Sequence, residues 1–340
     1  MNVSTIGLDI AKNVFQVHGE DAGGRAVIRK RLGRKAMMTF FAKLPPCLVA
    51  LEACGTSHYW GRTLRTMGHE VRLIPAAYVK PFVKRNKTDA RDAEAICVAA
   101  RRPDMRPVTI KSEEQQASRA LERSRELLVK QRTQLMNSLR AMLAEFGVVA
   151  AQGARGFAEL TARLTGDDPG LPETLVAALR VVLALLDKLT PAIEALEDRI
   201  KAVVKADPDM RRLSGIPGVG FLTAHAVVAA IGDGRQFARG RDFAAWAGMT
   251  AHEHSSAGKR RTIGVSRQGD SRLRKLFALG AVTLMRQARS RPERATQWRR
   301  GILARRPMKV AVIAQAAKTA RIAWAVLTSG KDYAPAATAA

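Results

Sequence analysis

The sequence predicts an α/β domain at the N-terminus, then a long helical connector, then a mostly α-helical C-terminal domain. Short apolar stretches alternate with amphipathic ones from residue 5 to residue 101, which is typical of an α/β fold. Residues 113–146 contain no Gly or Pro, and residues 175–203 place apolar side chains at alternating intervals of four and three. The predicted domains span residues 1–110, 111–206 and 207–330, with a disordered tail over 331–340.

The N-terminal elements follow from apolar periodicity and turn residues. The turn signal DAGG folds the third strand back on the second, and the apolar run CLVALEA suits a strand buried on both faces. Strands are predicted at residues 5–9, 14–18, 25–32, 47–53 and 71–75, and helices at 34–43, 57–67, 77–84 and 89–101.

Four carboxylates fall where this α/β unit could bring them together. Asp9 and Glu52 end two apolar strands, where a charged side chain is either exposed at the rim of the sheet or gathered around a metal. Asp89 and Asp92, three residues apart, share one side of a helix that begins near Thr88. The pair could simply be first-turn residues of that helix. Convergence of all four would bind Mg²⁺ or Mn²⁺.

The connector is predicted to consist of two long helices. Leu121, Leu128, Leu135 and Met142 recur at seven-residue intervals and form one apolar seam. In the second helix Pro191 is expected to kink or restart the chain, because an interior proline costs about 3 kcal/mol. The pattern favours coiled-coil dimerisation, and an ordinary helical bundle core is the alternative.

The C-terminal domain opens with a predicted helix-hairpin-helix over residues 214–232. Gly218 and Gly220 lie in its tight turn, which could present backbone N–H groups to a DNA phosphate. A plain αα-hairpin is the alternative. Further helices are expected at 237–249, 276–289 and 308–327.

A serine pair and a run of cations occupy residues 250–276. Ser255 or Ser256 could be a nucleophile toward DNA, although serines in such positions are more often loop or cap residues. The candidate phosphate contacts of the chain are Lys87, Gly218, Gly220, Lys259, Arg260, Arg261, Arg267, Arg272, Arg274 and Lys275.

Composition indicates a nucleic-acid partner. Lys and Arg number 57 against 30 Asp and Glu, a net charge of +27 that a polyanion would neutralise. No uncharged apolar run reaches the roughly 18 residues of a membrane span, so we expect a cytosolic protein with no membrane partner. The 3 cysteines favour reduced thiols over a disulfide framework.

Five motifs in the same order, from residue 5 to about residue 330, resemble the DEDD-type insertion-sequence transposases, a family that includes bridge-RNA-guided recombinases and Piv-type invertases. The motifs are GLDIAK, LEACGTS, NKTDARDAE, SGIPGVG, and SSAGK followed by SRQGDSRLRK. The resemblance implies a ribonuclease H-like N-terminal domain, similar to a Holliday-junction resolvase. Its Mg²⁺ (or Mn²⁺) ligands would be Asp9, Glu52, Asp89 and Asp92.

The same resemblance implies that Ser256 forms a covalent link to DNA, with the adjacent Ser255 as the alternative. This chain has Ala257 where the family more often has Gly, and Ala251 where Pro is usual. The implied partners are double-stranded donor and target DNA, a structured noncoding guide RNA from the element, and further copies of the chain in dimers that pair into tetramers. The implied location is the bacterial cytoplasm, at the nucleoid.

Two other functions compete with this one. A structure-selective endonuclease would cut Holliday-junction-type DNA with metal-activated water, and its C-terminal domain would only grip DNA. A non-enzymatic nucleic-acid scaffold would use the acidic residues structurally. A trapped protein–DNA adduct distinguishes the first function from both.

Overall fold

A computed structural model describes residues 2–83, 88–167, 170–259 and 261–335. The chain divides into two compact units, Met1–Glu113 and Glu114–Ala340. The boundary that we predicted between connector and C-terminal domain lies inside the second unit, and that division stays a prediction. The predicted disordered tail lies partly outside the described residues.

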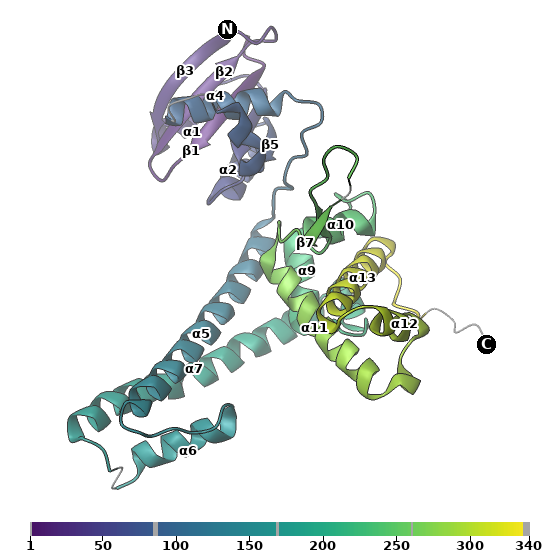
Figure 1. The fold of residues 1–340 in the computed structure, drawn as a ribbon. Helices are drawn as coiled ribbons and strands as arrows, with labels where there is room; N and C mark the ends of the chain where they lie inside the picture. Colours follow the sequence, from purple (N-terminus) through teal and green to yellow (C-terminus); the bar gives the residue numbers. More distant parts are fainter. Residues whose placement is uncertain (1, 84–87, 168–169, 260, 336–340) are drawn as a thin grey trace. The chain divides into compact units, whose positions relative to one another are not determined.

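Five strands form the sheet of the first unit (Figure 1). The strand order is β3-β2-β1-β4-β5; β2 is antiparallel to both neighbours, and β4 is parallel to β1 and β5. This arrangement is consistent with the predicted ribonuclease H-like fold. The strands are β1 (Thr5–Ile10), β2 (Val14–Glu20), β3 (Ala26–Gly33), β4 (Leu48–Glu52) and β5 (Glu70–Ile74).

Helices cover both faces of this sheet, because alternate side chains of its strands are apolar on each face. On one face Ile6 and Leu8 pack with Phe41 of α1 and Trp60 of α2. On the other face α4 lies over β1 and β4, and its small residues pack around Ala50. The helices of this unit are α1 (Arg34–Ala42), α2 (Ser57–Thr66), α3 (Ala76–Val79), the 3-10 turn η1 (Lys80–Phe82) and α4 (Asp89–Ala100).

Gly7 sets how closely α4 approaches β1. A Cβ atom at this position would lie 2.0 Å from the carbonyl oxygen of Ala93 and 2.6 Å from the backbone nitrogen of Cys97. Only a glycine therefore allows the helix to lie directly on the strand.

Three helices form an arm in the second unit: α5 (Glu113–Ala144), α6 (Ala154–Thr165) and α7 (Glu173–Ala206). They share a leucine-rich core, and Arg125 of α5 donates through Nε to Glu197 of α7 at 2.7 Å. The prediction missed α6. It also expected a kink or restart at Pro191, but α7 does not restart there. It continues as one helix, since buried residues on both sides of Pro191 hold it in place.

The rest of the second unit is mostly helical, as predicted, around one large core. Its elements are α8 (Pro208–Ser214), α9 (Phe221–Ile231), α10 (Gly240–Trp246), β6 (Ala251–Glu253), β7 (Thr262–Val265), α11 (Ser271–Ser290), η2 (Pro292–Arg294), α12 (Gln297–Arg305) and α13 (Met308–Ser329). The antiparallel hairpin of β6 and β7 and the helix α12 were not predicted.

By length and mean hydropathy, 1.4 over its most apolar window, α13 could cross a membrane. Half of that window is buried within the structure, and the helix packs against α10 and α11. Its apolar character is thus accounted for by its place in the core.

Candidate active-site residues

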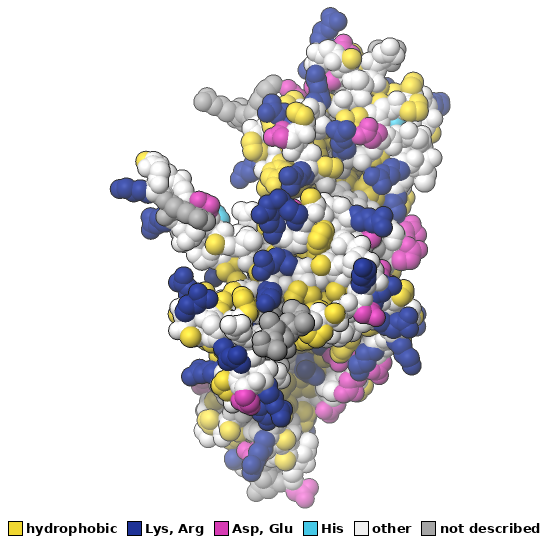
Figure 2. Space-filling model, turned by 90° about the vertical axis from the view of Figure 1, so that its right-hand side faces the viewer, with side chains coloured by type: hydrophobic (Ala, Val, Ile, Leu, Met, Phe, Trp, Pro, Cys, Tyr) yellow, Lys and Arg dark blue, Asp and Glu magenta, His cyan; other side chains and the backbone are white. Residues whose placement is uncertain are grey.

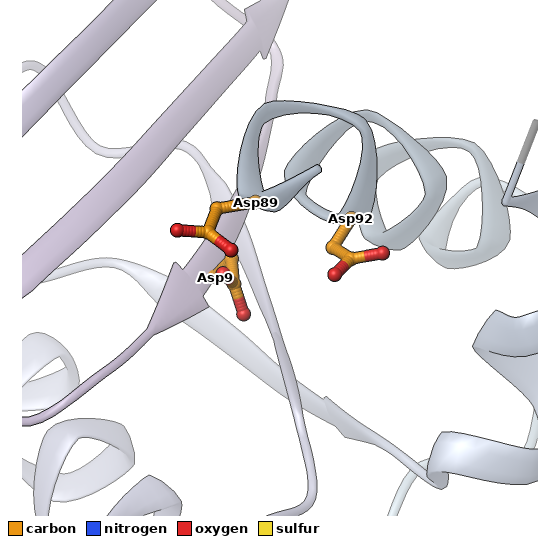
Figure 3. Close-up of side chains that lie close together, drawn as sticks. All are labelled: Asp9, Asp89 and Asp92. Carbon is orange, nitrogen blue, oxygen red and sulfur yellow. The ribbon is translucent and has the colours of Figure 1, made fainter. Parts of the chain in front are cut away.

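Three aspartates meet at one edge of the first unit. Asp9 lies near the end of β1, and Asp89 and Asp92 occupy the first turn of α4 (Figure 3). One carboxylate oxygen from each lies within 4.8 Å of the other two. Thr88 caps the helix, because its hydroxyl accepts from the backbone N–H of Arg91 at 3.4 Å. The partial positive charge of the helix N-terminus offsets some of the repulsion between these carboxylates.

Glu52 lies beside this cluster but is not part of it. Leu8 of β1 pairs with Leu51 of β4, so the next residues along the two parallel strands, Asp9 and Glu52, lie side by side near the ends of these strands, on the face that α4 covers. Burial, and after it the negative charges of Glu52 and Asp9, raise the pKa of the Cys54 thiol. The carboxylates of Glu52 and Asp9 are therefore both close enough to the turn after β4 to influence the same thiol.

The two candidate serines differ in their surroundings. Ser255 Oγ donates to Glu253 Oε1 at 2.8 Å and accepts from the backbone N–H of Arg261 at 3.3 Å. Among the residues that the structure describes, none is recorded in a hydrogen bond with Ser256 Oγ. Ser256 is exposed and opens the turn that joins β6 to β7.

That turn has the type I′ geometry of tight hairpins. The N–H of Lys259 donates to the carbonyl oxygen of Ser256 at 3.0 Å, and the two residues between them have positive φ, 50° at Ala257 and 73° at Gly258. Positive φ is strained at alanine by about 1 kcal/mol or more. Ala257 therefore occupies a position where glycine would fit better.

The predicted phosphate contacts fall into three groups. Lys259, Arg261 and Arg267 are exposed, and Lys275 is largely so, with an ion pair to Glu126 at 3.5 Å. Arg272 and Arg274 make internal contacts instead, described below. Lys87 and Arg260 lie outside the described residues. Lys and Arg side chains are spread over the face drawn in Figure 2.

Gly218 and Gly220 lie in the turn between α8 and α9. Gly218 has φ 84°, and Gly220 precedes the first residue of α9. The turn borders a cavity of about 460 Å³ together with Gly280 and Thr283 of α11. It is therefore open on one side, as a phosphate-binding turn requires.

Comparison with known proteins assigns the family. Residues 6–147 match the DEDD transposase model of IS110 elements, described as "Transposase", and residues 210–298 match the model "Transposase IS116/IS110/IS902 family". A probable family 20 transposase of Pseudomonas aeruginosa is 45% identical over 98% of this chain and 100% of its own length. The chain belongs to the IS110/IS116 family of DEDD transposases.

Relatives from other organisms agree. The transposase for insertion sequence element IS1111A of Coxiella burnetii is 39% identical, over 98% of this chain and 92% of the relative. The transposase for IS1328 of Yersinia enterocolitica is 38% identical, over 98% and 99%. The protein is thus a DNA-processing transposase, and the predicted resemblance is confirmed.

Sequence reasoning missed an ionic network inside this transposase. Glu122 of α5 is 2% exposed and binds two partners: His225 of α9, 0% exposed, at 2.5 Å from Nδ1, and Nη1 of Arg272 at 3.2 Å. Asp270 caps α11 by accepting from the N–H of Arg272 and also pairs with Arg119 of α5 at 3.2 Å. The network ties α5 to the start of α11.

A second internal clamp holds the segment between β7 and α11. Arg274 donates through Nη1 to the carbonyl oxygens of Ala247 and Gln268, at 3.2 and 3.1 Å. The sequence alone does not distinguish an arginine that binds backbone carbonyl groups, such as Arg274 in the first turn of α11, from one that contacts a phosphate. Arg272 and Arg274 therefore fix the segment that follows the serine hairpin.

Proposed function

We propose that this transposase cuts and rejoins the DNA of a mobile element through a serine–phosphate intermediate, with a divalent metal ion bound by its acidic cluster. The observation that carries the proposal is the convergence of Asp9, Asp89 and Asp92 at the edge of a ribonuclease H-like sheet. Glu52, at the end of the neighbouring strand, would complete the set.

The donor set fits Mg²⁺ or Mn²⁺. Both ions prefer carboxylate oxygens, and ligands about 2.1 Å from one ion are separated by up to roughly 4.2 Å. The carboxylate oxygens of the three aspartates lie within 4.8 Å of one another, close to this spacing. When bound, the ion would polarise the scissile phosphate and stabilise the charge that develops on it.

Ser256 is the proposed nucleophile. Its hydroxyl would attack a backbone phosphorus, so that one Oγ–P bond forms, one P–O bond to deoxyribose breaks, and the serine proton passes through solvent to the leaving oxygen. The reverse steps rejoin DNA without any further energy source. Both serines are exposed, but the Ser255 hydroxyl already donates to Glu253 and accepts from the N–H of Arg261, and this difference favours Ser256.

The proposed substrates are donor and target duplex DNA, chosen by a structured noncoding RNA. The net charge of +27 supports polyanionic partners. The turn at Gly218 and Gly220 supports a helix-hairpin-helix that contacts a phosphate through backbone N–H groups.

The proposed assembly is a dimer that pairs into a tetramer through the helical arm, in the bacterial cytoplasm. Large apolar side chains on α5 and α7 remain exposed in the single chain, notably Leu127 at 54%, Val181 at 65% and Leu185 at 51%. Such side chains support coiled-coil pairing between subunits, since burial of the exposed part of each would contribute roughly half of the 1.5–3 kcal/mol of full burial. Light scattering with nucleic acid present tests the assembly, and a monomer would contradict it.

Adduct trapping tests the chemistry. Full-length protein is incubated with Mg²⁺, its RNA and donor and target DNA, then denatured, and DNA-linked protein is measured. We expect an adduct that Ser256→Ala abolishes and the matched Ser255→Ala retains. An adduct lost only in Ser255→Ala moves the nucleophile. Metal-dependent cutting without any adduct points instead to a nuclease that uses water.

Metal binding has its own readout. Mn²⁺ should raise the melting temperature of the wild-type protein, because it binds the folded acidic cluster and relieves carboxylate repulsion. Asp89→Asn should reduce this shift, and the control Asp104→Asn, an exposed aspartate of the same unit outside the cluster, should not. Unchanged DNA cutting in Glu52→Ala would exclude Glu52 from the site.

A further inference from the structure

A cavity of about 420 Å³ lies at the C-terminal end of α11, on the second unit. Arg291 follows α11, Arg294 belongs to η2, and Arg299 belongs to α12; all three line the cavity, together with Leu284 and Gln287. None of the residues that we assign to DNA cutting contributes to it.

The cavity is strongly cationic. No carboxylate lines it, and within the described part of the chain no ion pair is recorded for any of the three arginines. Glu293 stands between two of them in sequence but does not line the cavity. Three guanidinium groups around one hollow repel one another, so an anion inside it would lower their free energy.

Buried groups hold Arg299 in place. Its Nε donates to Oε1 of Gln315 at 3.0 Å, and Gln315, 3% exposed, donates in turn to Thr319 Oγ1 at 3.0 Å. Burial lowers the pKa of Arg299. Burial also lowers the pKa of the neighbouring Lys318, and the charge of Arg299 lowers it further. The positive charge of Arg299 is therefore held in a fixed position at some energetic cost, whereas Arg291 and Arg294 are exposed.

The cavity continues the surface of the turn between α8 and α9. Gly280 and Thr283 of α11 border the turn, whereas Leu284 and Gln287, farther along the same helix, and Arg291, just after its end, border the arginine cavity. Residues 280, 283, 284 and 287 recur at intervals of three and four, so they lie on one face of α11. The side chain of Leu284 also approaches Gly218, so the two hollows adjoin.

We propose that the arginine cavity binds a backbone phosphate of nucleic acid, as a grip separate from the serine hairpin. The nature of the polymer rests on the proposed function, whereas the anion site rests on the cavity alone. The 20 residues of α11 span about 30 Å, and one turn of B-DNA about 34 Å. The cavity would therefore hold a phosphate roughly one helical turn from a strand engaged near the start of α11.

Salt-dependent binding tests this inference on the full-length protein. Affinity for a fluorescent duplex is measured over a series of salt concentrations for wild type and for Arg291→Gln/Arg294→Gln. The matched control is Arg286→Gln/Arg289→Gln, which removes the same charge from exposed positions of α11 outside the cavity. All four arginines are exposed, so circular dichroism should show an unchanged fold.

We expect the cavity variant to lose about 0.9 units of the slope of log K against log salt, the value for one phosphate contact, and the control to lose much less. A repeat with the structured RNA distinguishes the two polymers: loss on duplex DNA identifies DNA as the ligand, and loss on RNA alone identifies RNA. Equal slopes for the cavity variant and the control on both polymers would overturn the proposal.

Adduct trapping on the same variants separates this inference from the proposed function. Unchanged slopes with an intact Ser256 adduct would contradict only the cavity. A lost slope in a protein whose wild type forms no adduct would contradict only the serine chemistry.

Discussion

Glu122→Gln should destabilise the helical unit strongly. The substitution preserves side-chain volume but removes the negative charge that faces Arg272, whose side chain is only 15% exposed. Removing one partner of a buried ion pair costs about 3–5 kcal/mol, and the half-exposed Glu126, 3.9 Å from Arg272, would offset only part of that loss. For a unit of this size that loss lowers the melting temperature by roughly 6–20 °C, at 2–4 °C per kcal/mol.

Urea unfolding followed by circular dichroism measures the change. Glu126→Gln is the control, because Glu126 lies one turn along α5 and pairs with Arg272 at 3.9 Å and with Lys275 from a half-exposed position. Its loss should cost at most about 1 kcal/mol. A double-mutant cycle with Arg272→Met isolates the pair. If Glu122→Gln costs no more than the control, the network does not hold α5 and α11 together.

Two further predictions concern local chemistry and packing. Cys54 is exposed, whereas Cys47 and Cys97 are buried, so alkylation of the native protein should label one thiol per chain. Partial burial of the Cys54 thiol, and after it the charges of Glu52 and Asp9, raise its pKa. The alkylation rate should reach half-maximum above the usual pH of about 8.5, and Glu52→Gln should shift the profile to lower pH; labelling of a second thiol would contradict the burial. Gly280→Ala should destabilise by about 1–3 kcal/mol despite better helix propensity, because its Cβ would lie 1.9 Å from the carbonyl oxygen of Gly218. Thermal melting compares it with Gly301→Ala, whose Cβ would lie 4.0 Å from Nη2 of the flexible Arg305; equal melting temperatures would refute the close packing.

The N-terminal fold could be predicted closely because each strand carries its own signal. The predicted strand at 47–53 is β4 (Leu48–Glu52), and the predicted helix at 89–101 is α4 (Asp89–Ala100). The hairpin of β6 and β7 could not be predicted, since its strands have only 3 and 4 residues, too few for a clear apolar alternation. Its turn also places Ala257 at a positive φ that sequence preferences argue against.

The candidate site divides in the same way. The sequence was enough to predict that Asp9, Asp89 and Asp92 lie close together, because Asp89 and Asp92 are three residues apart on a helix and Asp9 lies near a strand end. The internal contacts of Arg272 could not be foreseen, because its partner Glu122 lies far away in sequence on another helix. Charge alone does not tell a buried arginine from one that meets DNA.

The arrangement of the acidic cluster also depends on an uncharged residue, Gly7. It stands two residues before Asp9, and the atom that it touches belongs to Ala93, the residue after Asp92. The distance between Asp9 on the strand and the two aspartates on the helix is thus set by direct contact between the backbones of β1 and α4. Any side chain at position 7 would push α4 away from β1 and so separate Asp9 from Asp89 and Asp92, although all three aspartates would still be present. A copy of the element could lose its activity this way while every acidic residue still reads as present, so an inventory of functional copies should check the glycine along with the aspartates.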